Sequence, residues 1–399
     1  MNVLYVLPRF PAASETFVAE EVLGLRARGH IVTAVALARP TEVQISKMGE
    51  RLKSLICTTV YLPRVPLLNL GSLVWAKSSA RALNVRMLGD APGLVHSYLR
   101  FARAAAIAKH ARQCRADLIY AHWPRPSEVA LLAGEISGLP VGLSIHAHEV
   151  AHDNGHFPIA FERIRFAAFC NGAAMNYLLS RLPRDARRKA HLIYHGVDIG
   201  QFPRTPLPSF DGVLQVITAG RLTPTKGIDR LIRIMAMARD RGVAVALTVI
   251  GDGSQKSDLE ALASGLGLLG RVRFVGWVPH EEMRELLSGA HVFALLADDT
   301  FHDGLPNVVM EAMSLGRPCI LSPLPAASEV VEHGVNGYIL ARVDAPGEFV
   351  NCCAALAKDP DKLSRWSRAA AETAHARYDR AGQLDRLCEL FADSIRCGH

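Results

Sequence analysis

Two acidic residues enclose a short turn that contains glycine and proline. Asp303 and Glu311 are separated by seven residues, and Gly304-Leu305-Pro306 lies between them. Proline is tolerated in the first turn of a helix, so we expect a helix that begins near Pro306 and ends at Gly316 and Pro318. The free amides of a helix N-terminus suit an anionic phosphate, and carboxylates suit sugar hydroxyls. The pattern therefore predicts a site for a ligand that carries both groups.

Glycines and cations occur together at two further places in the second half of the chain. Gly220-Arg221 and then Lys226 follow one apolar run, and Gly251-Asp252-Gly253 follows the next. Two cations beside a helix N-terminus would neutralise a phosphate that gains charge as it leaves. Taken alone, an Arg and a Lys in a loop are most often solvated. The glycine triplet alone indicates a tight turn.

Apolar runs of strand length alternate with helical patterns along the whole chain. The clearest runs are Val3–Leu7, Ile31–Leu37, Val213–Thr218, Val245–Ile250, Val272–Val275, Val292–Leu296 and Cys319–Leu321. Such alternation is typical of α/β architecture with parallel sheets. In doubly wound sheets, ligands bind outside the carboxyl ends of the strands. We expect two Rossmann-like doubly wound domains that face each other across a cleft.

The chain has 399 residues, which is too long for one ordinary core and suits two domains. Residues 201–212 contain three prolines and a glycine, a composition typical of an interdomain linker. The predicted division is a first domain over 1–200, a second over 213–375, and a helical C-terminal segment over 376–399.

The positive charge is concentrated in the first half of the chain. The formal net charge is +7, and residues 1–199 carry 24 Lys and Arg against 14 Asp and Glu. Within them, Lys77–Arg115 holds eight basic residues and one acidic residue, Asp90. Such a segment favours an anionic partner. No nucleic-acid motif accompanies it, so a membrane surface or a phosphorylated lipid fits better. A solvated, arginine-rich face is the alternative.

Composition excludes several classes of protein. No apolar run approaches the ~20 residues that span a bilayer, and Asn2–Leu7 lacks the basic leader of a secretory signal. We expect a cytoplasmic protein, peripheral at the inner face of the cell membrane. No C-x-x-C pair occurs among the eight cysteines, and no third ligand accompanies the pair His146 and His148. Neither metal nor disulfides are expected.

The run DGLPNVVMEAMSLGRP, residues 303–318, resembles the signature of family 4 of the retaining glycosyltransferases, which have the GT-B fold. The segments 220–227, 251–253 and 274–276 resemble other family motifs in the same order. The resemblance implies that Glu311 binds the ribose of a nucleotide and that Asp303 contacts the transferred sugar. The family usually has Glu in place of Asp303. A change of one methylene is typically worth ~1–3 kcal/mol in discrimination.

Motifs of the first half are similar to those of exopolysaccharide members of this family, of the colanic-acid type. They are Pro8–Pro11 with Ser14–Phe17, Ala121-His122-Trp123, and Ser144–Glu149. The resemblance implies that His146 is the histidine near the reacting sugar. It also implies that residues 1–200 bind the acceptor, that 213–375 bind the donor, and that the C-terminal helix returns to the first domain.

The family suggests a full set of site residues. Those expected near the reaction are His146, Arg221, Lys226 and Asp303. Those expected to hold the donor are Gly220, Arg221, Lys226, Gly251, Gly253, Gly304, Leu305, Pro306 and Glu311. The donor would be a UDP- or GDP-sugar and the acceptor a lipid-linked or other saccharide hydroxyl, with no cofactor or metal.

Three alternatives remain open at this point. They are a nucleotide-sugar epimerase of the same fold, a transferase that acts on a small natural-product acceptor, and a non-catalytic carbohydrate- or lipid-binding relative. The joint presence of Arg221, Lys226 and Glu311 argues against the last.

Overall fold

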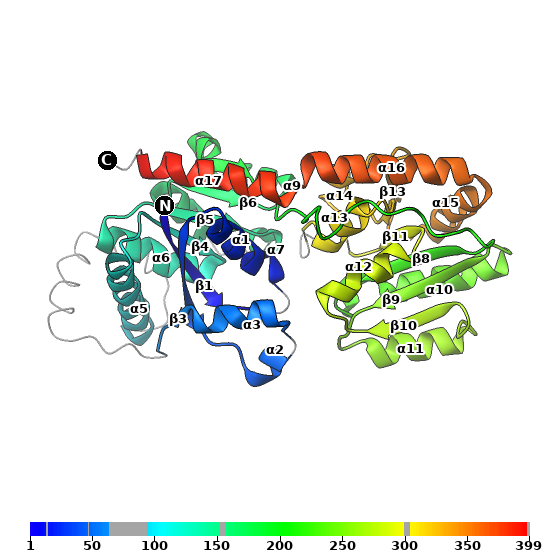
Figure 1. Cartoon of the computed structure of the whole chain (residues 1–399), viewed down its shortest axis with the longest axis horizontal. Helices are drawn as coiled ribbons and strands as arrows, with labels where there is room; N and C mark the ends of the chain where they lie inside the picture. Colours follow the sequence, from blue (N-terminus) through cyan, green and yellow to red (C-terminus); the bar gives the residue numbers. More distant parts are fainter. Residues whose placement is uncertain (13–14, 47, 64–93, 152–155, 299–303, 397–399) are drawn as a thin grey trace. The chain divides into compact units, whose positions relative to one another are not determined.

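The computed structural model describes residues 1–12, 15–46, 48–63, 94–151, 156–298 and 304–396 (Figure 1). The chain forms two compact units. The first comprises residues 1–170, 174–193 and 384–399, and the second comprises residues 171–173 and 194–383. Each unit contains its own parallel sheet.

In the described part of the first unit, seven parallel strands form one sheet in the order β3-β2-β1-β4-β5-β6-β7. The strands are β1 (Asn2–Arg9), β2 (Ile31–Ala38), β3 (Thr59–Tyr61), β4 (Leu118–His122), β5 (Val141–Ile145), β6 (Phe166–Phe169) and β7 (Ala190–Leu192). The helices are α1 (Thr16–Ala27), α2 (Glu42–Ser46), α3 (Glu50–Cys57), α5 (Leu94–Gln113), α6 (Pro124–Ser137), α7 (Ala147–Ala151), α8 (His156–Arg163) and α9 (Gly172–Leu179), followed by the 3₁₀ turn η2 (Arg184–Lys189). The strand order reverses between β1 and β4, which is where such sheets bind ligands.

This sheet is buried on both faces because β1 is apolar at nearly every position. Leu4 and Val6 pack into one core, with residues of α5 and α6. Tyr5 and Leu7 point to the opposite face and pack into a second core with α1 and with α17 (Arg380–Arg396). Alternation of side chains along the strand thus explains why helices cover both faces.

The second unit repeats this plan with six described parallel strands in the order β10-β9-β8-β11-β12-β13. They are β8 (Leu214–Ala219), β9 (Val245–Ile250), β10 (Val272–Gly276), β11 (Val292–Leu295), β12 (Cys319–Leu321) and β13 (Gly337–Ile339). The helices are α10 (Ile228–Asp240), α11 (Lys256–Gly265), α12 (His280–Ser288), α13 (Asn307–Ser314), α14 (Ala327–Val330), α15 (Pro346–Lys358) and α16 (Pro360–Arg377), with η3 (Pro224–Lys226) before α10. Here the order reverses between β8 and β11.

The predicted α/β class and the two doubly wound sheets are confirmed. The expected strands at 245–250 and 319–321 have the bounds of β9 and β12. Of the basic segment, residues 94–113 form helix α5, and Lys77–Gly93 lies outside the described residues. The helical tail consists of two helices, α16 and α17, which belong to different units over most of their length.

The predicted linker packs against the second unit. Arg317 is fully buried and donates hydrogen bonds to the carbonyls of Thr205 (3.0 Å), Pro206 (2.8 Å) and Ala290 (3.1 Å). Burial lowers the pKa of Arg317 to about 10. Because a buried guanidinium needs these acceptors, residues 205–206 are held to the sheet rather than left as a free tether.

The second unit also begins earlier than residue 201. The amide of Val197 donates to the carbonyl of Tyr378 at 2.7 Å, and the amide of Arg380 donates to the carbonyl of Val197 at 2.9 Å. These backbone bonds join residues 194–200 to the end of α16, which places them in the second unit.

Among the described helices, none is long and apolar enough to cross a membrane.

Candidate functional site

The loops that follow β8 and β9 lie against each other through their glycines. The amide of Gly220 donates to the carbonyl of Ile250, and that of Leu222 donates to the carbonyl of Asp252, each at 3.0 Å. At Gly251 the φ angle is 134°, and an added β-carbon would lie 1.8 Å from the carbonyl oxygen of Gly220. Only glycine allows this approach. The two predicted glycine motifs therefore form one structure at the carboxyl edge of the sheet.

Lys226 is presented by a tight turn between β8 and α10. It ends η3 and is followed by Gly227, whose φ is 63° and whose β-carbon would lie 1.9 Å from the carbonyl oxygen of Leu296. The stem of Lys226 passes beside Gly220, since a β-carbon there would be 3.7 Å from Cε of the lysine. Lys226 is half-buried, whereas Arg221 is exposed. The loop thus offers two cations at the point where the strand order reverses.

An ion pair fixes the end of β11 against this loop. Arg230 on α10 pairs with Asp298 and donates to the carbonyl of Leu296 at 2.9 Å. The amide of Asp298 donates to the carbonyl of Thr225 at 3.0 Å. These contacts hold the backbone after β11 close to the turn that carries Lys226.

Helix α13 begins where the sequence predicts, and it brings Glu311 to the same edge of the sheet. Pro306 precedes the helix as its N-cap residue, and within the described residues no side-chain cap is formed there. Glu311 is 8% exposed, and its Oε1 lies 3.0 Å from Nε2 of His280, the first residue of α12. The His280 ring packs edge-on against Phe202, with ring centroids 5.2 Å apart. A carboxylate in this setting is held in one orientation by its histidine partner.

The turn before α13 is described from Gly304 onward. Gly304 has a φ of 54°, and Leu305 is 9% exposed. The side-chain oxygen Oδ1 of Asn307 is buried and has no hydrogen-bond partner within the described residues. A buried acceptor of this kind needs a donor, which ligand hydroxyls could supply. Asp303 lies outside the described residues, so its contact with the sugar stays a prediction.

His146 follows β5 in the first unit and lies among aromatic rings. Its ring stacks on Trp123 at 4.9 Å with 17° between the planes, and Phe17 is 5.3 Å away. Trp123 has a φ of 67°, a left-handed conformation that costs a bulky residue of order 1–3 kcal/mol. Strain of this kind persists where the surroundings enforce it, and it often marks a functional site. His146 thus lies beside a strained residue at the carboxyl edge of its sheet.

Glu149, two residues into α7, is a buried acid beside His146. It is 5% exposed, and its Oε2 accepts a hydrogen bond of 3.2 Å from the amide of His146. Burial raises the pKa of Glu149 well above its ordinary value, and the hydrogen bond opposes that shift. Its Oε1 has no partner in the part of the chain that the structure describes. The structure thus places the Glu149 carboxylate against the backbone of His146, a contact that the sequence motif alone did not specify.

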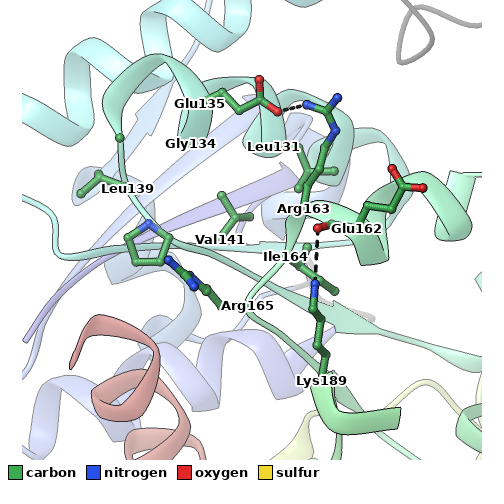
Figure 2. A pocket seen from close by; sticks show the side chains of 12 residues that line it. Leu131, Gly134, Glu135, Leu139, Val141, Glu162, Arg163, Ile164, Arg165 and Lys189 are labelled. Carbon is green, nitrogen blue, oxygen red and sulfur yellow. Dashed lines mark hydrogen bonds and ion pairs between the residues drawn. The ribbon is translucent and has the colours of Figure 1, made fainter. Parts of the chain in front are cut away.

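A cavity of 420 Å³ occupies the opposite edge of the first sheet (Figure 2). It is lined by Val141, which begins β5, by Arg165, which precedes β6, and by Lys189, which precedes β7. Lys189 donates to the carbonyl of Phe161 at 2.6 Å, and Arg163 pairs with Glu135. These are amino ends of strands, so the cavity is separate from the edge that carries His146.

The structure brings most of the predicted donor residues to one edge of the second sheet. The loops of Gly220, Gly251, Gly253 and Lys226 form one interlocked structure. Leu305 and Pro306 directly precede α13, and Glu311 lies within that helix. Sequence reasoning missed His280 and Asn307. His280 begins the helix that follows β10. Its position after a strand, where such sheets bind ligands, could have marked it as a candidate site residue.

Residues 203–373 match the protein family described as Glycosyl transferases group 1. Most of the second unit, including the glycine loops and Glu311, falls within these residues. The chain is similar to the putative colanic acid biosynthesis glycosyltransferase WcaL of Escherichia coli (strain K12), with 25% identity over 91% of this chain and 93% of that protein. It is also 25% identical to the alpha-D-kanosaminyltransferase of Streptomyces kanamyceticus over 66% of this chain and 72% of the relative.

Among solved structures, the fold is similar to that of the Anabaena protein HepE in complex with UDP. The TM-score is 0.74 at 19% identity, and the alignment covers 98% of this chain and 100% of HepE. The family match thus covers most of the second unit, and the fold of the chain is that of the GT-B glycosyltransferases. Its relatives include exopolysaccharide and lipopolysaccharide glycosyltransferases.

Proposed function

We propose that the chain is a retaining glycosyltransferase of family 4 that moves a sugar from a UDP- or GDP-sugar to an acceptor hydroxyl in exopolysaccharide or lipopolysaccharide assembly. The observation that carries the proposal is the set of groups at the carboxyl edge of the second sheet. The cations Arg221 and Lys226 and the N-terminus of α13 suit a diphosphate. The buried carboxylate of Glu311 suits the hydroxyls of a ribose.

In this reaction the bond between the anomeric carbon and the donor phosphate breaks, and a bond from that carbon to the acceptor oxygen forms on the same face. Lys226 and Arg221 stabilise the diphosphate as it gains negative charge. The leaving phosphate oxygen takes the proton of the acceptor hydroxyl. The reaction then needs neither a separate protein nucleophile nor a metal, and we assign neither.

His146 would support the transferred sugar, and Asp303 would contact one of its hydroxyls. The acceptor would be a lipid-linked or other saccharide, presented at the inner face of the membrane. The basic segment 77–115 would hold the protein to the anionic lipid there.

Donor choice is tested first by thermal shift with a panel of nucleotide sugars, because a bound ligand raises apparent stability. Transfer from the best donor is then measured for Lys226→Ala and for the control Lys358→Ala, an exposed lysine of the same unit. Loss of a charge-assisted contact of about 1.5–3 kcal/mol predicts a roughly 10- to 150-fold slower transfer for Lys226→Ala alone. Equal activities in the two variants, with both folded, would overturn the donor assignment.

Two other activities are outcomes of the same experiment. An epimerase converts the donor without an acceptor, so NMR of enzyme and donor alone would show a new sugar isomer. The kanosaminyltransferase likeness makes a small-molecule acceptor the second candidate. Transfer to small polyols or aminocyclitols with none to lipid-linked saccharides would favour it.

A further inference from the structure

The loop between β10 and α12 carries an exposed tryptophan. Trp277 directly follows β10 and is 50% exposed. The other large apolar side chains that are exposed in the described part of the second unit are Phe210, Leu269 and Val335, and they precede β8, β10 and β13. These three lie on the amino side of their strands. Trp277 instead lies at the carboxyl edge, where such sheets bind ligands.

The start of this loop is bonded to the glycine loops. Gly276 ends β10 with a φ of 86°, and its carbonyl accepts a hydrogen bond of 2.8 Å from the amide of Gly251. The pairing of β10 with β9 changes register between Phe274 and Gly276, and such an irregularity re-aims the residues that follow it. Trp277 therefore begins beside the loops that carry the proposed diphosphate-binding groups.

The end of the same loop is bonded to the proposed ribose-binding residue. His280 begins α12, and its Nε2 lies 3.0 Å from Oε1 of Glu311. Trp277 is three residues before His280, so their α-carbons are at most about 11 Å apart. The loop that carries Trp277 thus runs from the glycine loops at one end to Glu311 at the other.

The indole of Trp277 is open to a ligand. Among the residues that the structure describes, none makes a hydrogen bond, a ring contact or a cation contact with it. The other two described tryptophans have partners, since Trp123 stacks on His146 and Trp366 is 3% exposed with the amine of Lys362 over its ring. An open aromatic face at a ligand-binding edge suits a flat, aromatic ligand group.

We infer that Trp277 is a binding residue that stacks on the base of the donor nucleotide. The inference rests on the proposed function, because it requires the nucleoside diphosphate that is there assigned to the second unit. The base is attached to C1′ of the ribose, next to the carbon that bears the 2′-hydroxyl. A ribose bound at Glu311 therefore brings its base within reach of the loop 276–280. Every base has a π face, so this contact contributes affinity for uracil and for guanine alike.

The first test compares ligands with and without a base. Isothermal titration with UDP and GDP is carried out on the wild type, on Trp277→Ala and Trp277→Phe, and on the control Leu269→Ala, which changes another exposed apolar residue of the same unit. Trp277→Ala should bind the nucleoside diphosphate roughly 5- to 150-fold more weakly, the loss that one base–aromatic stack implies. Trp277→Phe should keep most of the affinity, because a phenyl ring also stacks. Ribose 5-diphosphate, which lacks the base, should bind the wild type and Trp277→Ala equally.

The second test reads the contact by fluorescence. A base that stacks on an indole quenches its emission, so the nucleoside diphosphate should lower the emission of the wild type and of Leu269→Ala. Trp277→Phe keeps the other tryptophans of the chain. It should lose the change in emission that the ligand causes, while titration calorimetry still records binding.

Equal affinities of the wild type and Trp277→Ala for the nucleoside diphosphate would overturn the inference. A loss of the same size with ribose 5-diphosphate would also overturn it, because Trp277 would then act on the loop and not on the base. In both cases Lys226→Ala and Glu311→Gln still test the donor site by themselves. A wild type that binds neither UDP nor GDP would overturn the proposed donor and this inference together.

Discussion

Nε2 of His280 lies 3.0 Å from Oε1 of Glu311, and this contact links the first residue of α12 to the middle of α13 at the proposed donor site. The two residues are 31 positions apart in the sequence. Glu311 has little exposure, so its orientation depends on the partner that the fold provides. In the proposed donor site, His280 would hold one carboxylate oxygen while the other receives a ribose hydroxyl.

Glu311→Gln is expected to weaken binding of the nucleoside diphosphate roughly 10- to 150-fold. The reason is the loss of a hydrogen bond to a charged acceptor, which is worth about 1.5–3 kcal/mol. Isothermal titration with UDP or GDP measures this loss, and the exposed Glu281→Gln on α12 serves as the control. With the 2′,3′-dideoxy nucleotide the wild-type and variant affinities should converge. An undiminished difference with that analogue would argue against a ribose contact.

Gly227→Ala should destabilise the second unit more than Gly242→Ala does. Both glycines have positive φ, 63° and 68°, and an alanine in that conformation costs about 1–2 kcal/mol. A β-carbon at Gly242 meets nothing within 4 Å, whereas at Gly227 it would overlap the carbonyl oxygen of Leu296. Overpacking adds about 1–3 kcal/mol at Gly227. Urea unfolding gives both free energies, and equal losses would show that the turn near Lys226 relaxes freely.

Glu149→Gln should stabilise the protein at neutral pH. Burial raises the pKa of Glu149 in the folded state, so between its ordinary value and the raised value the unfolded state binds fewer protons. Stability then falls as pH rises through that window, by about 1.4 kcal/mol for each unit. The neutral amide escapes this penalty and can still accept from the amide of His146.

Thermal or urea unfolding from pH 4 upward, taken as a series, tests this prediction. The advantage of Glu149→Gln should vanish below the ordinary pKa of a glutamate, where both states are protonated. Glu162→Gln, at an exposed position of the same unit, should show no such trend. A constant difference at every pH would point to packing rather than to proton binding.

The basic segment predicts binding to anionic vesicles that depends on salt. Flotation with vesicles containing phosphatidylserine should carry the protein upward at low ionic strength and release it near 1 M salt. The Debye length falls from ~10 Å at 0.1 M to ~3 Å at 1 M, which screens the attraction. The triple variant Lys77→Glu, Arg81→Glu, Arg86→Glu should lose binding.

A charge-matched control makes the membrane test specific. Arg233→Glu, Arg273→Glu and Arg284→Glu change three exposed arginines of the second unit by the same total charge. This variant should still float with the vesicles. Binding that is insensitive to salt, or lost equally in both variants, would favour the alternative of a solvated basic face.

The sequence by itself determined the fold class and the local structure of most loops that are proposed to hold the donor. Alternating apolar runs predict parallel strands because both faces of such a sheet are buried, and the bounds of β9 and β12 match those predicted. Glycines and the proline at Pro306 are local signals, so the turns after β8 and β9 and the start of α13 could be read from them. The family resemblance then assigned a ligand to those turns.

Tertiary structure alone decided the partners of the buried polar groups. An arginine just after a helix is usually expected at the surface. Arg317 is instead buried in the second unit, where it donates hydrogen bonds to the carbonyls of residues 205 and 206. His280 meets Glu311, and Glu21 meets His122, across sequence separations that no local pattern encodes. A buried charge or imidazole is satisfied by whichever group the packing brings near it. The identity of that partner depends on how strands and helices are arranged in space. Local patterns along the sequence do not specify this arrangement.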